Sequence, residues 1–254
     1  MGTEFLEIPW IPTADAAMVV VDGRIPEQIE KNIRERNIQI LKMPFCSDVY
    51  DAIACHPDIF LHPIDSRNIV VAPNVYRAFE MKLKALGFHV IRGDTVLTKT
   101  YPHNIAYNIA RLGNYAIHNF HYTDKQVRQL LEEKGTTFIH VKQGYAKCSV
   151  CIVNDHAMIT SDKGIARAVE KYDIDVLTIS AGHIELPGLN EGLIGGASGL
   201  LGKNKLAFLG SLYHHPDYKR IMEFLRKHQV TPVFLTEEKI KDFGSILPIL
   251  QFSA

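Results

Sequence analysis

The sequence is poor in cysteine, has no excess of either charge and contains no long hydrophobic run. Its four cysteines include one C-x-x-C pair, Cys148 and Cys151, without the second pair that a zinc site needs. Lys plus Arg number 28 and Asp plus Glu number 28, so no basic excess indicates a nucleic-acid partner. The apolar runs at 16–21 and 246–250 are far shorter than a membrane span.

These absences favour a globular protein of the reducing cytoplasm. The first ten residues, MGTEFLEIPW, lack the charged-then-apolar pattern of a secretory signal. The 12 histidines are scattered, and no two of them stand with a carboxylate at the spacing of a metal site. We therefore expect no metal, no cofactor, no nucleic acid and no membrane. With 46% hydrophobic residues, the chain has enough apolar material for a sizeable core.

One structural unit recurs about five times along the chain, at a spacing of roughly 40 to 55 residues. Each unit contains an apolar strand, a turn, a second apolar strand, an amphipathic helix and a short final strand. The segment 244–252 has no helix of its own, and it predicts a strand that completes the first unit. The five units span residues 16–45, 58–93, 113–144, 148–180 and 195–237.

The hairpin before each helix predicts a ring of five units. A doubly wound sheet is the alternative, but it has only one strand for each helix. Five units of the ββαβ type can close around an axis, which removes the exposed sheet edges of an open array. We therefore predict one α/β domain over residues 1–254, with residues 1–15 as a lead-in.

This order of elements resembles the pentein fold of the guanidino-group-modifying enzymes. These include arginine deiminase, dimethylarginine dimethylaminohydrolase, agmatine deiminase and the amidinotransferases, and a ribosome anti-association factor uses the fold without catalysis. The stretch YHHPDYKRIMEFLRKHQVTPVFLTEEKIKDFGSILPIL is similar in layout to the last blade and C-terminal strand of the dimethylarginine hydrolases. The resemblance implies a five-bladed α/β propeller with pseudo-five-fold symmetry.

The family's chemistry needs a cysteine nucleophile, a histidine acid/base and carboxylates that grip a guanidinium. By resemblance, the nucleophile belongs in GSILPIL, which contains no cysteine. Tyr145 stands where the histidine is expected, and Asn114 stands in place of a third-blade carboxylate. Asp58, just before the apolar run that follows, matches one second-blade carboxylate. Thiol chemistry on guanidines is therefore not expected of this chain.

Two clusters remain as candidates at the mouths of the blades. His56 and Asp58 in CHPD suit ligand holding, with a backbone turn as the alternative. Tyr145, Lys147 and Cys148 lie together in GYAKCS, where a lysine could lower the thiol pKa and activate the cysteine. The alternative is that Cys148 is a small buried hydrophobe.

A Gly/Pro-broken loop between the fourth and fifth units supplies further candidates. His183 and Glu185 in AGHIELPGLNEG suit acid/base work or simple solvation. Ser198, within GGASG, lies where glycines let the backbone approach a ligand or a neighbouring blade.

These observations predict a protein that binds a small cationic ligand, such as a guanidine, amidine or amino acid, at the propeller axis. The family's hydrolase or amidinotransferase chemistry is then absent or rebuilt. The alternative is a non-catalytic protein that uses one ring face for a macromolecular partner. We assign possible catalysis to Cys148, His183 and Glu185, and ligand contacts to His56, Asp58, Asn114, Tyr145, Lys147 and Ser198.

Overall fold

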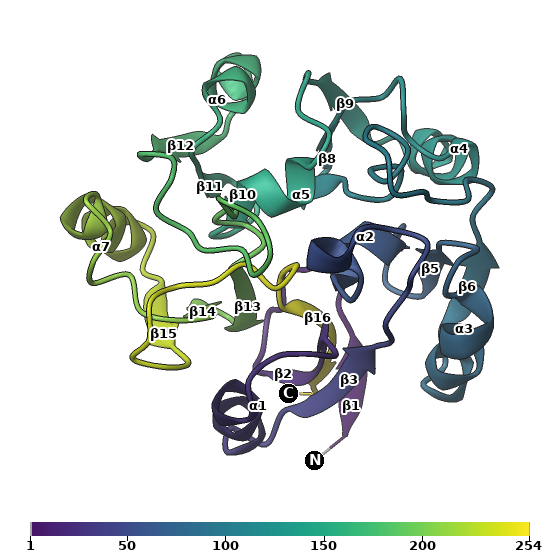
Figure 1. Cartoon of the computed structure of the whole chain (residues 1–254), viewed down its shortest axis with the longest axis horizontal. Coiled ribbons are helices and arrows are strands. Elements are labelled where there is room, and N and C mark those ends of the chain that lie inside the picture. The colour runs from purple at the N-terminus through teal and green to yellow at the C-terminus, as the bar shows by residue number, and fades with distance from the viewer. Residues whose placement is uncertain (1, 254) are drawn as a thin grey trace.

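Five small sheets stand around a common centre in the computed structural model, which describes residues 2–253 (Figure 1). The long helices lie on the outside of the ring, and each connects the last two strands of its sheet (Figure 1). This arrangement confirms the predicted pentein architecture of repeated ββαβ units. No helix within residues 2–253 is long and apolar enough to cross a membrane.

Four of the sheets share one strand pattern. The first two strands of each sheet pair antiparallel, and the third strand, which follows the helix, pairs parallel with the second. The elements are β4 (Leu61–Pro63), β5 (Asn68–Val71), α3 (Tyr76–Ala85) and β6 (His89–Arg92); β7 (Ala110–Leu112), β8 (Tyr115–His118), α4 (Lys125–Glu133) and β9 (Thr137–His140); β10 (Val150–Ile152), β11 (Ala157–Thr160), α6 (Lys163–Val169) and β12 (Asp175–Thr178); β13 (Ser198–Gly202), β14 (Lys205–Phe208), α7 (Tyr218–Lys227) and β15 (Thr231–Phe234).

The remaining sheet joins the two ends of the chain. The C-terminal strand β16 (Leu247–Phe252) pairs antiparallel with β2 (Ala16–Asp22), which pairs parallel with β3 (Gln39–Met43) after α1 (Glu27–Arg34). The predicted closing strand is thus confirmed. The lead-in adds β1 (Thr3–Phe5), which pairs antiparallel with the edge of β16 opposite β2. The repeat pattern did not predict this strand.

Apolar periodicity explains why these segments form helices over buried strands. Helix α1 buries Ile29 and Ile33, which lie four positions apart on one face, and α4 buries Val127 and Leu131 in the same way. Every residue of β2 is buried, as expected for a central strand covered on both faces.

Three blades begin differently from the prediction. The third blade begins with β7 at Ala110, before the predicted start of its unit at residue 113. The sequence indicated strands from residues 58 and 148, but one-turn helices occupy these places: α2 (Pro57–Phe60) and α5 (Ala146–Ser149). Pro57 suits the first turn of a helix because its missing N–H needs no partner there. Each of these helices lies at the centre of the ring, immediately before the first strand of its blade (Figure 1).

Candidate functional site

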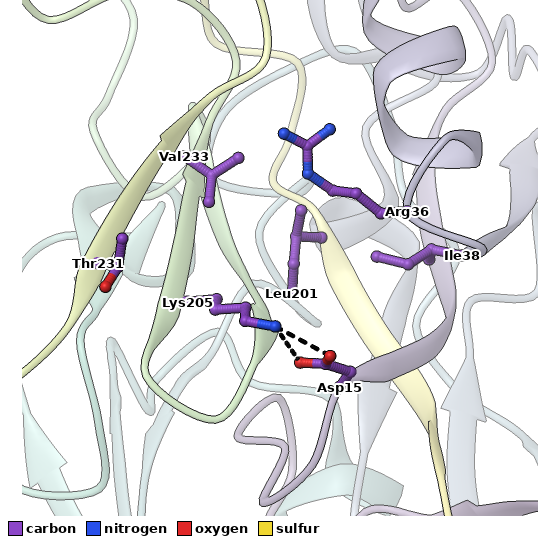
Figure 2. Close-up of a pocket in the computed structure, with 7 residues that line it drawn as sticks. All are labelled: Asp15, Arg36, Ile38, Leu201, Lys205, Thr231 and Val233. Carbon is purple, nitrogen blue, oxygen red and sulfur yellow. Dashed lines mark hydrogen bonds and ion pairs between the residues drawn. The ribbon is translucent and has the colours of Figure 1, made fainter.

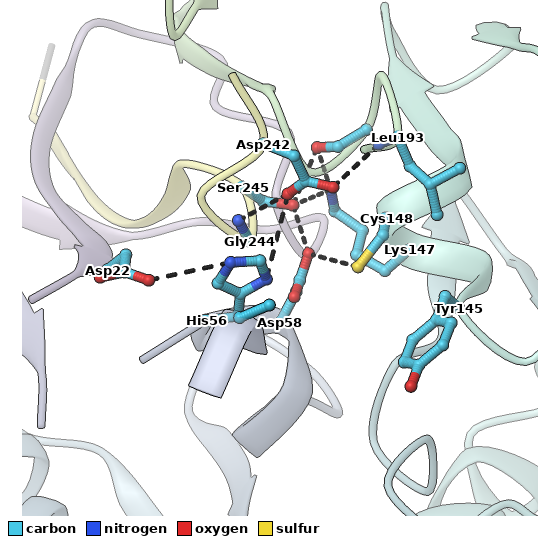
Figure 3. A network of polar contacts seen from close by, with 12 residues as sticks. Asp22, His56, Asp58, Tyr145, Lys147, Cys148, Leu193, Asp242, Gly244 and Ser245 are labelled. Atoms are coloured by element: carbon cyan, nitrogen blue, oxygen red, sulfur yellow. Dashed lines mark hydrogen bonds and ion pairs between the residues drawn. The ribbon is translucent and has the colours of Figure 1, made fainter. Parts of the chain in front are cut away.

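A buried polar cluster, here called the hub, fills the centre of the ring (Figure 3). Helices α2 and α5 contribute to it from opposite sides, and the loop before β16 contributes from a third direction. Residues far apart in sequence therefore meet there. Its members are Asp22, His56, Asp58, Lys147, Cys148, Asp242 and Ser245, together with Asn108, which bonds to Asp58 and Cys148.

The Ser245 hydroxyl links a carboxyl group to an ammonium group. Ser245 Oγ donates a hydrogen bond of 2.6 Å to Asp58 Oδ2, and Lys147 Nζ donates one of 2.9 Å to Ser245 Oγ. Cys148 Sγ donates to the same Asp58 oxygen at 3.2 Å. These side chains are almost inaccessible to solvent, with exposed fractions of 1% for Asp58 and Ser245 and 4% for Lys147 and Cys148. The hub is thus a dry site in which charge interactions are strong.

Asn108 holds α5 against α2. Its Nδ2 donates to the Asp58 carbonyl oxygen at 3.0 Å and to Cys148 Sγ at 3.1 Å. Its Oδ1 accepts from the backbone N–H groups of Lys147 at 2.9 Å and Cys148 at 3.2 Å. Because the amide nitrogen donates and the amide oxygen accepts, Asn108 fixes the position of Cys148 relative to Asp58.

His56 lies between two further carboxyl groups without bonding to either. Its Nε2 is 3.8 Å from Asp22 Oδ2, and its Nδ1 is 4.0 Å from Asp242 Oδ1. Both ring nitrogens, and also Asp58 Oδ1, lack a hydrogen-bond partner among residues 2–253. Buried polar atoms are normally paired, so three free ones in a single cluster indicate a place where a ligand can bond.

Burial dominates the titration of the hub. Desolvation, with the charge of Asp58 as the next cause, raises the pKa of Asp242 to about 7. The pKa of Asp58 is raised by desolvation too, against the lowering effect of Lys147. Desolvation and the charge of Arg24 lower the pKa of His56 to about 3, so this ring is neutral at physiological pH.

The pKa of the Cys148 thiol is raised, whereas the sequence predicted that Lys147 would lower it. Desolvation and the neighbouring Asp58 carboxyl raise the thiol pKa well above its ordinary value. Lys147, adjacent in sequence, donates to Ser245 and to the Gly195 carbonyl oxygen. The predicted lowering of the thiol pKa by this lysine is therefore wrong, because its ammonium is used elsewhere.

The charges of the hub do not balance when all its carboxyl groups are ionised. Arg24 forms a 2.7 Å ion pair with Asp22, which accounts for one carboxylate. Lys147 is the cation that remains for Asp58 and Asp242, and His56 is neutral. The hub therefore either keeps a proton on one carboxyl group or accepts one further cation.

Tyrosines lie beside this acidic centre. Tyr50 Oη is 3.2 Å from Tyr145 Oη, and Tyr145 Oη donates to Asn104 Oδ1 at 2.9 Å. The rings of Tyr101 and Tyr145 are 5.8 Å apart, and Tyr101 is half exposed. Tyr145 lies next to Cys148 in Figure 3, so this group extends from the hub toward solvent.

Glycines allow the backbone to close tightly over the hub. A Cβ atom at Gly196 would lie 2.1 Å from Asp242 Oδ1, and one at Gly244 would lie 2.2 Å from the His56 Cβ. The N–H groups of Leu193 and Gly244 each donate to Asp242 at 2.9 Å. The loop between the fourth and fifth blades thus covers the carboxyl group of Asp242.

The structure brings five of the nine predicted site residues to the centre and four elsewhere. His56, Asp58, Tyr145, Lys147 and Cys148 lie at or beside the hub. Ser198 is buried at the start of β13, where its Oγ donates to the Ile194 carbonyl oxygen.

The remaining three predicted residues lie outside the hub. Asn114 occupies the exposed turn between β7 and β8 and donates to the Gly135 carbonyl oxygen. His183 packs edge-on against the His215 ring, and Glu185 forms a 3.2 Å ion pair with Lys239. The Glu185 backbone still serves the hub indirectly, because its carbonyl oxygen accepts from the N–H of Asp242 at 2.7 Å.

Sequence reasoning missed Asp22, Asn108, Asp242 and Ser245. Asp242 and Ser245 lie in DFGS, directly before β16, in the stretch to which the resemblance assigned the nucleophile. The resemblance predicts a cysteine in this stretch, and the hydroxyl of Ser245 is the nucleophilic group that the stretch contains instead. Asn108 comes two residues before β7, as Asp58 comes shortly before β4, so its position relative to the blade was the available signal.

A cavity of about 280 Å³ opens between the first and fifth blades, away from the hub (Figure 2). Within residues 2–253, no group of three or more His, Cys, Asp or Glu side chains has the geometry to hold a metal ion. The residues that line the cavity are Asp15, Arg36, Ile38, Leu201, Lys205, Thr231 and Val233.

Comparison with solved structures places the fold. The amidinotransferase SxtG of the saxitoxin pathway from Microseira wollei matches with a TM-score of 0.59 at 11% identity, over 98% of each chain. The inosamine-phosphate amidinotransferase StrB1 from Streptomyces griseus gives 0.56 at 9% identity, over 97% of each chain. Agmatine deiminase from C. jejuni gives 0.55 at 11% identity, over 93% of this chain and 91% of that one. All three are pentein proteins, and at such identities the likeness concerns the fold alone.

Sequence comparison gives a family without an assigned activity. The model of a "Family of unknown function (DUF6873)" matches residues 20–247. No curated protein matches the sequence.

Proposed function

The chain belongs to this family of unknown function, DUF6873, and we propose that it binds a small cationic molecule at the hub, without the thiol chemistry of the guanidino-modifying penteins. The ligand is a guanidine, an amidine or an amine of amino-acid size. Cys148, the one cysteine of the hub, carries a raised thiol pKa, and the stretch before β16 offers a serine instead. The proposed function is therefore the binding of this ligand, with no reaction of a thiol.

The uncompensated carboxyl group of the hub is the observation that carries this proposal. Asp58 and Asp242 share a single ammonium, that of Lys147, and burial raises the pKa of Asp242 to about 7. A buried carboxylate is costly unless it is paired. A ligand cation near Asp242 replaces the proton as its partner, so it gains a charge-assisted contact in a dry site.

The neighbouring groups suit the rest of such a ligand. His56 and Asp58 Oδ1 supply buried hydrogen-bonding atoms that have no partner within residues 2–253. Tyr50 and Tyr145 add aromatic faces beside the acidic centre, and such faces attract cations. Entry requires the loop that packs on Asp242 to move, because the hub side chains are buried.

A thermal-shift screen tests this function. Guanidines, amidines and amines are compared with ureas of the same shape, which carry no charge. A ligand present at 100 times its Kd stabilises by about 2.7 kcal/mol, which corresponds to a melting-temperature increase of roughly 5–10 °C for a chain of this size. We expect this increase in wild type and in the control Asp173→Asn, which changes an exposed carboxylate, and none in Asp242→Asn. Equal responses to cations and ureas would contradict the proposal.

The closed centre also supports a second function, binding of a macromolecule by one face of the ring. In that case the hub is a structural plug, and its polar network serves stability. This alternative predicts no response to any small cation, together with binding to a partner that hub substitutions leave unchanged. A pull-down with wild type and Asp242→Asn, compared by mass spectrometry, separates the two functions.

A further inference from the structure

The hydrogen-bond chain from Lys147 through Ser245 to Asp58 has the form of an activated hydroxyl. Ser245 Oγ donates to Asp58 Oδ2 at 2.6 Å, its shortest contact, with the Gly195 carbonyl oxygen as a second acceptor at 2.9 Å, and it accepts a hydrogen bond from Lys147 Nζ at 2.9 Å. A nucleophilic hydroxyl needs a base within hydrogen-bond distance and a positive group that stabilises the charge left on oxygen. Ser245 Oγ has both: the Asp58 carboxyl group as the base and the Lys147 ammonium as the positive group.

We propose that Ser245 is a nucleophile, with Asp58 as its base and Lys147 as the stabiliser of its developing negative charge, and that the hub hydrolyses a small cationic carboxylic ester. This inference rests on the proposed function, because the cationic part of the ester occupies the ligand site at Asp242. It adds a reaction and a residue that binding alone does not need.

The serine is held at the point where three segments meet. Its N–H donates to the Gly196 carbonyl oxygen at 2.6 Å, and β16 begins two residues later. Gly244, at a φ of +69°, turns the chain sharply just before the serine and packs its backbone against His56. Rigid support of this kind keeps a nucleophile in one orientation.

Asp58 has the properties of a base for this hydroxyl. Its Oδ2 accepts from Ser245 and from the Cys148 thiol, while its Oδ1 has no partner within residues 2–253. Desolvation raises the pKa of this carboxyl group, which makes its anion a stronger proton acceptor than an exposed aspartate. The free oxygen is available to a leaving group or a water molecule.

The steps balance without a further reactant except water. An electron pair of Ser245 Oγ forms a bond to the ester carbonyl carbon as the hydroxyl proton passes to Asp58, and the carbonyl π pair moves to its oxygen. When that oxyanion collapses, the bond to the alcohol oxygen breaks and the alcohol takes the proton from Asp58. Water then gives a proton to Asp58 and attacks the acyl carbon, and Ser245 leaves with that proton, so the products are a carboxylic acid and an alcohol.

The nucleophile favours an ester over an amide or a guanidinium. A hydroxyl is a weaker nucleophile than a thiolate, and resonance makes the carbon of an amide or guanidinium a poor electrophile. The carbonyl carbon of an ester is a better electrophile, so a serine hydroxyl can attack it. His56, whose two ring nitrogens lack partners within the described part of the chain, offers a neutral N–H as a donor to the oxyanion.

Two measurements on the full-length protein test the inference. Wild type is incubated with a fluorophosphonate probe, and the labelled peptide is identified by mass spectrometry. Separately, hydrolysis of acetylcholine is compared with that of its uncharged carbon analogue, 3,3-dimethylbutyl acetate. We expect label on Ser245 and faster hydrolysis of the cationic ester, with Ser245→Ala lowering the hydrolysis rate by roughly 10³-fold or more. Ser149→Ala is the matched control, because Ser149 is buried beside Cys148 and its Oγ bonds to nothing within residues 2–253.

The possible results separate this inference from the proposed function. Label on Ser245 with preference for the cationic ester supports both. If small cations raise the melting temperature of wild type but neither label nor hydrolysis occurs, the nucleophile is refuted and the binding function stands. If cations have no effect either, both fail. Label on another serine, or hydrolysis that survives in folded Ser245→Ala, also overturns the inference.

Discussion

Ser245 and Asp58 are 187 positions apart in sequence, yet a 2.6 Å hydrogen bond joins their side chains at the centre of the ring. This contact exists because β16 returns to the first blade, which brings the end of the chain next to α2. The hub is therefore a product of ring closure, and its energetics should be coupled across the blades.

The first prediction concerns this coupling. Asp58→Asn removes a buried carboxylate whose charge acts on the Lys147 ammonium and to which that ammonium is linked through Ser245, so we expect it to lower the free energy of unfolding by about 3–5 kcal/mol. Lys147→Met should cost a similar amount. The double variant should lose less than the sum of the two, because it removes both buried charges. Urea unfolding of the four proteins measures the coupling, and strictly additive losses would show that these groups do not interact.

The pH dependence of stability provides the second prediction. The pKa of Asp242 is raised to about 7 in the folded protein, above its unfolded value, so the folded state binds more protons than the unfolded state between those two values. The stability contributed by this group is complete at low pH and is lost as pH rises through 7. His56, with its pKa lowered to about 3, acts oppositely, but only below its ordinary value of 6.5.

Between about pH 6.5 and pH 8, the carboxyl effect therefore remains without that opposition from His56. We expect the melting temperature of wild type to fall over this range and that of Asp242→Asn to fall less, because Asp58 is then the carboxyl group with a raised pKa that remains in the hub. Calorimetric scans at half-unit pH intervals make the comparison. A parallel fall in both proteins would assign the pH dependence to another group.

The third prediction concerns cysteine reactivity. All four cysteines are buried, and desolvation raises the thiol pKa values of Cys55 and Cys151 to about 11 and that of Cys148 well above its ordinary value. Iodoacetamide at pH 7.5 should therefore label Cys148 no faster than Cys151 in the native protein. Both should react quickly in 6 M guanidinium chloride. Early, selective labelling of Cys148 would restore it as a reactive thiol.

The fourth prediction concerns the glycines over the hub. In Gly196→Ala the new methyl group meets the Asp242 carboxyl group at 2.1 Å, and this buried carboxyl group is held by the N–H groups of Leu193 and Gly244. Overpacking of this kind costs about 1–3 kcal/mol. Gly164→Ala is the control, since Gly164 lies in α6 and its Cβ meets only the Asp162 side chain, at 3.0 Å. Equal stability of the two variants in urea would mean that the cover over Asp242 is loose.

Local patterns explain why the blades could be predicted. The helix faces of Ile29 and Ile33 and the closing strand after Ser245 follow from periodicity and turn residues within a single unit. The starts of the blades could not be predicted so well, because a one-turn helix and a buried strand share the same short apolar pattern. For this reason strands were expected at Asp58 and Cys148, where the structure has the one-turn helices α2 and α5.

The membership of the hub depended on information that no single unit carries. Asn108 and Asp242 lie in irregular segments, and only ring closure places them beside Asp58 and Cys148. The resemblance placed Asn114 at the start of the third blade, but that blade begins with β7 at Ala110, close to Asn108. The chemistry of the centre thus follows from long-range contacts, whereas the blades follow from short-range ones.

Proton release on binding tests the central claim most directly. A cation that replaces the proton of Asp242 must expel that proton, so titration calorimetry at pH 6.5 in phosphate and in MES, two buffers with different protonation enthalpies, should give different apparent enthalpies. The account predicts release of up to about one proton per ligand in wild type and none in Asp242→Asn. Binding of a guanidine, amidine or amine with no proton release, or with the same release in both proteins, would contradict it.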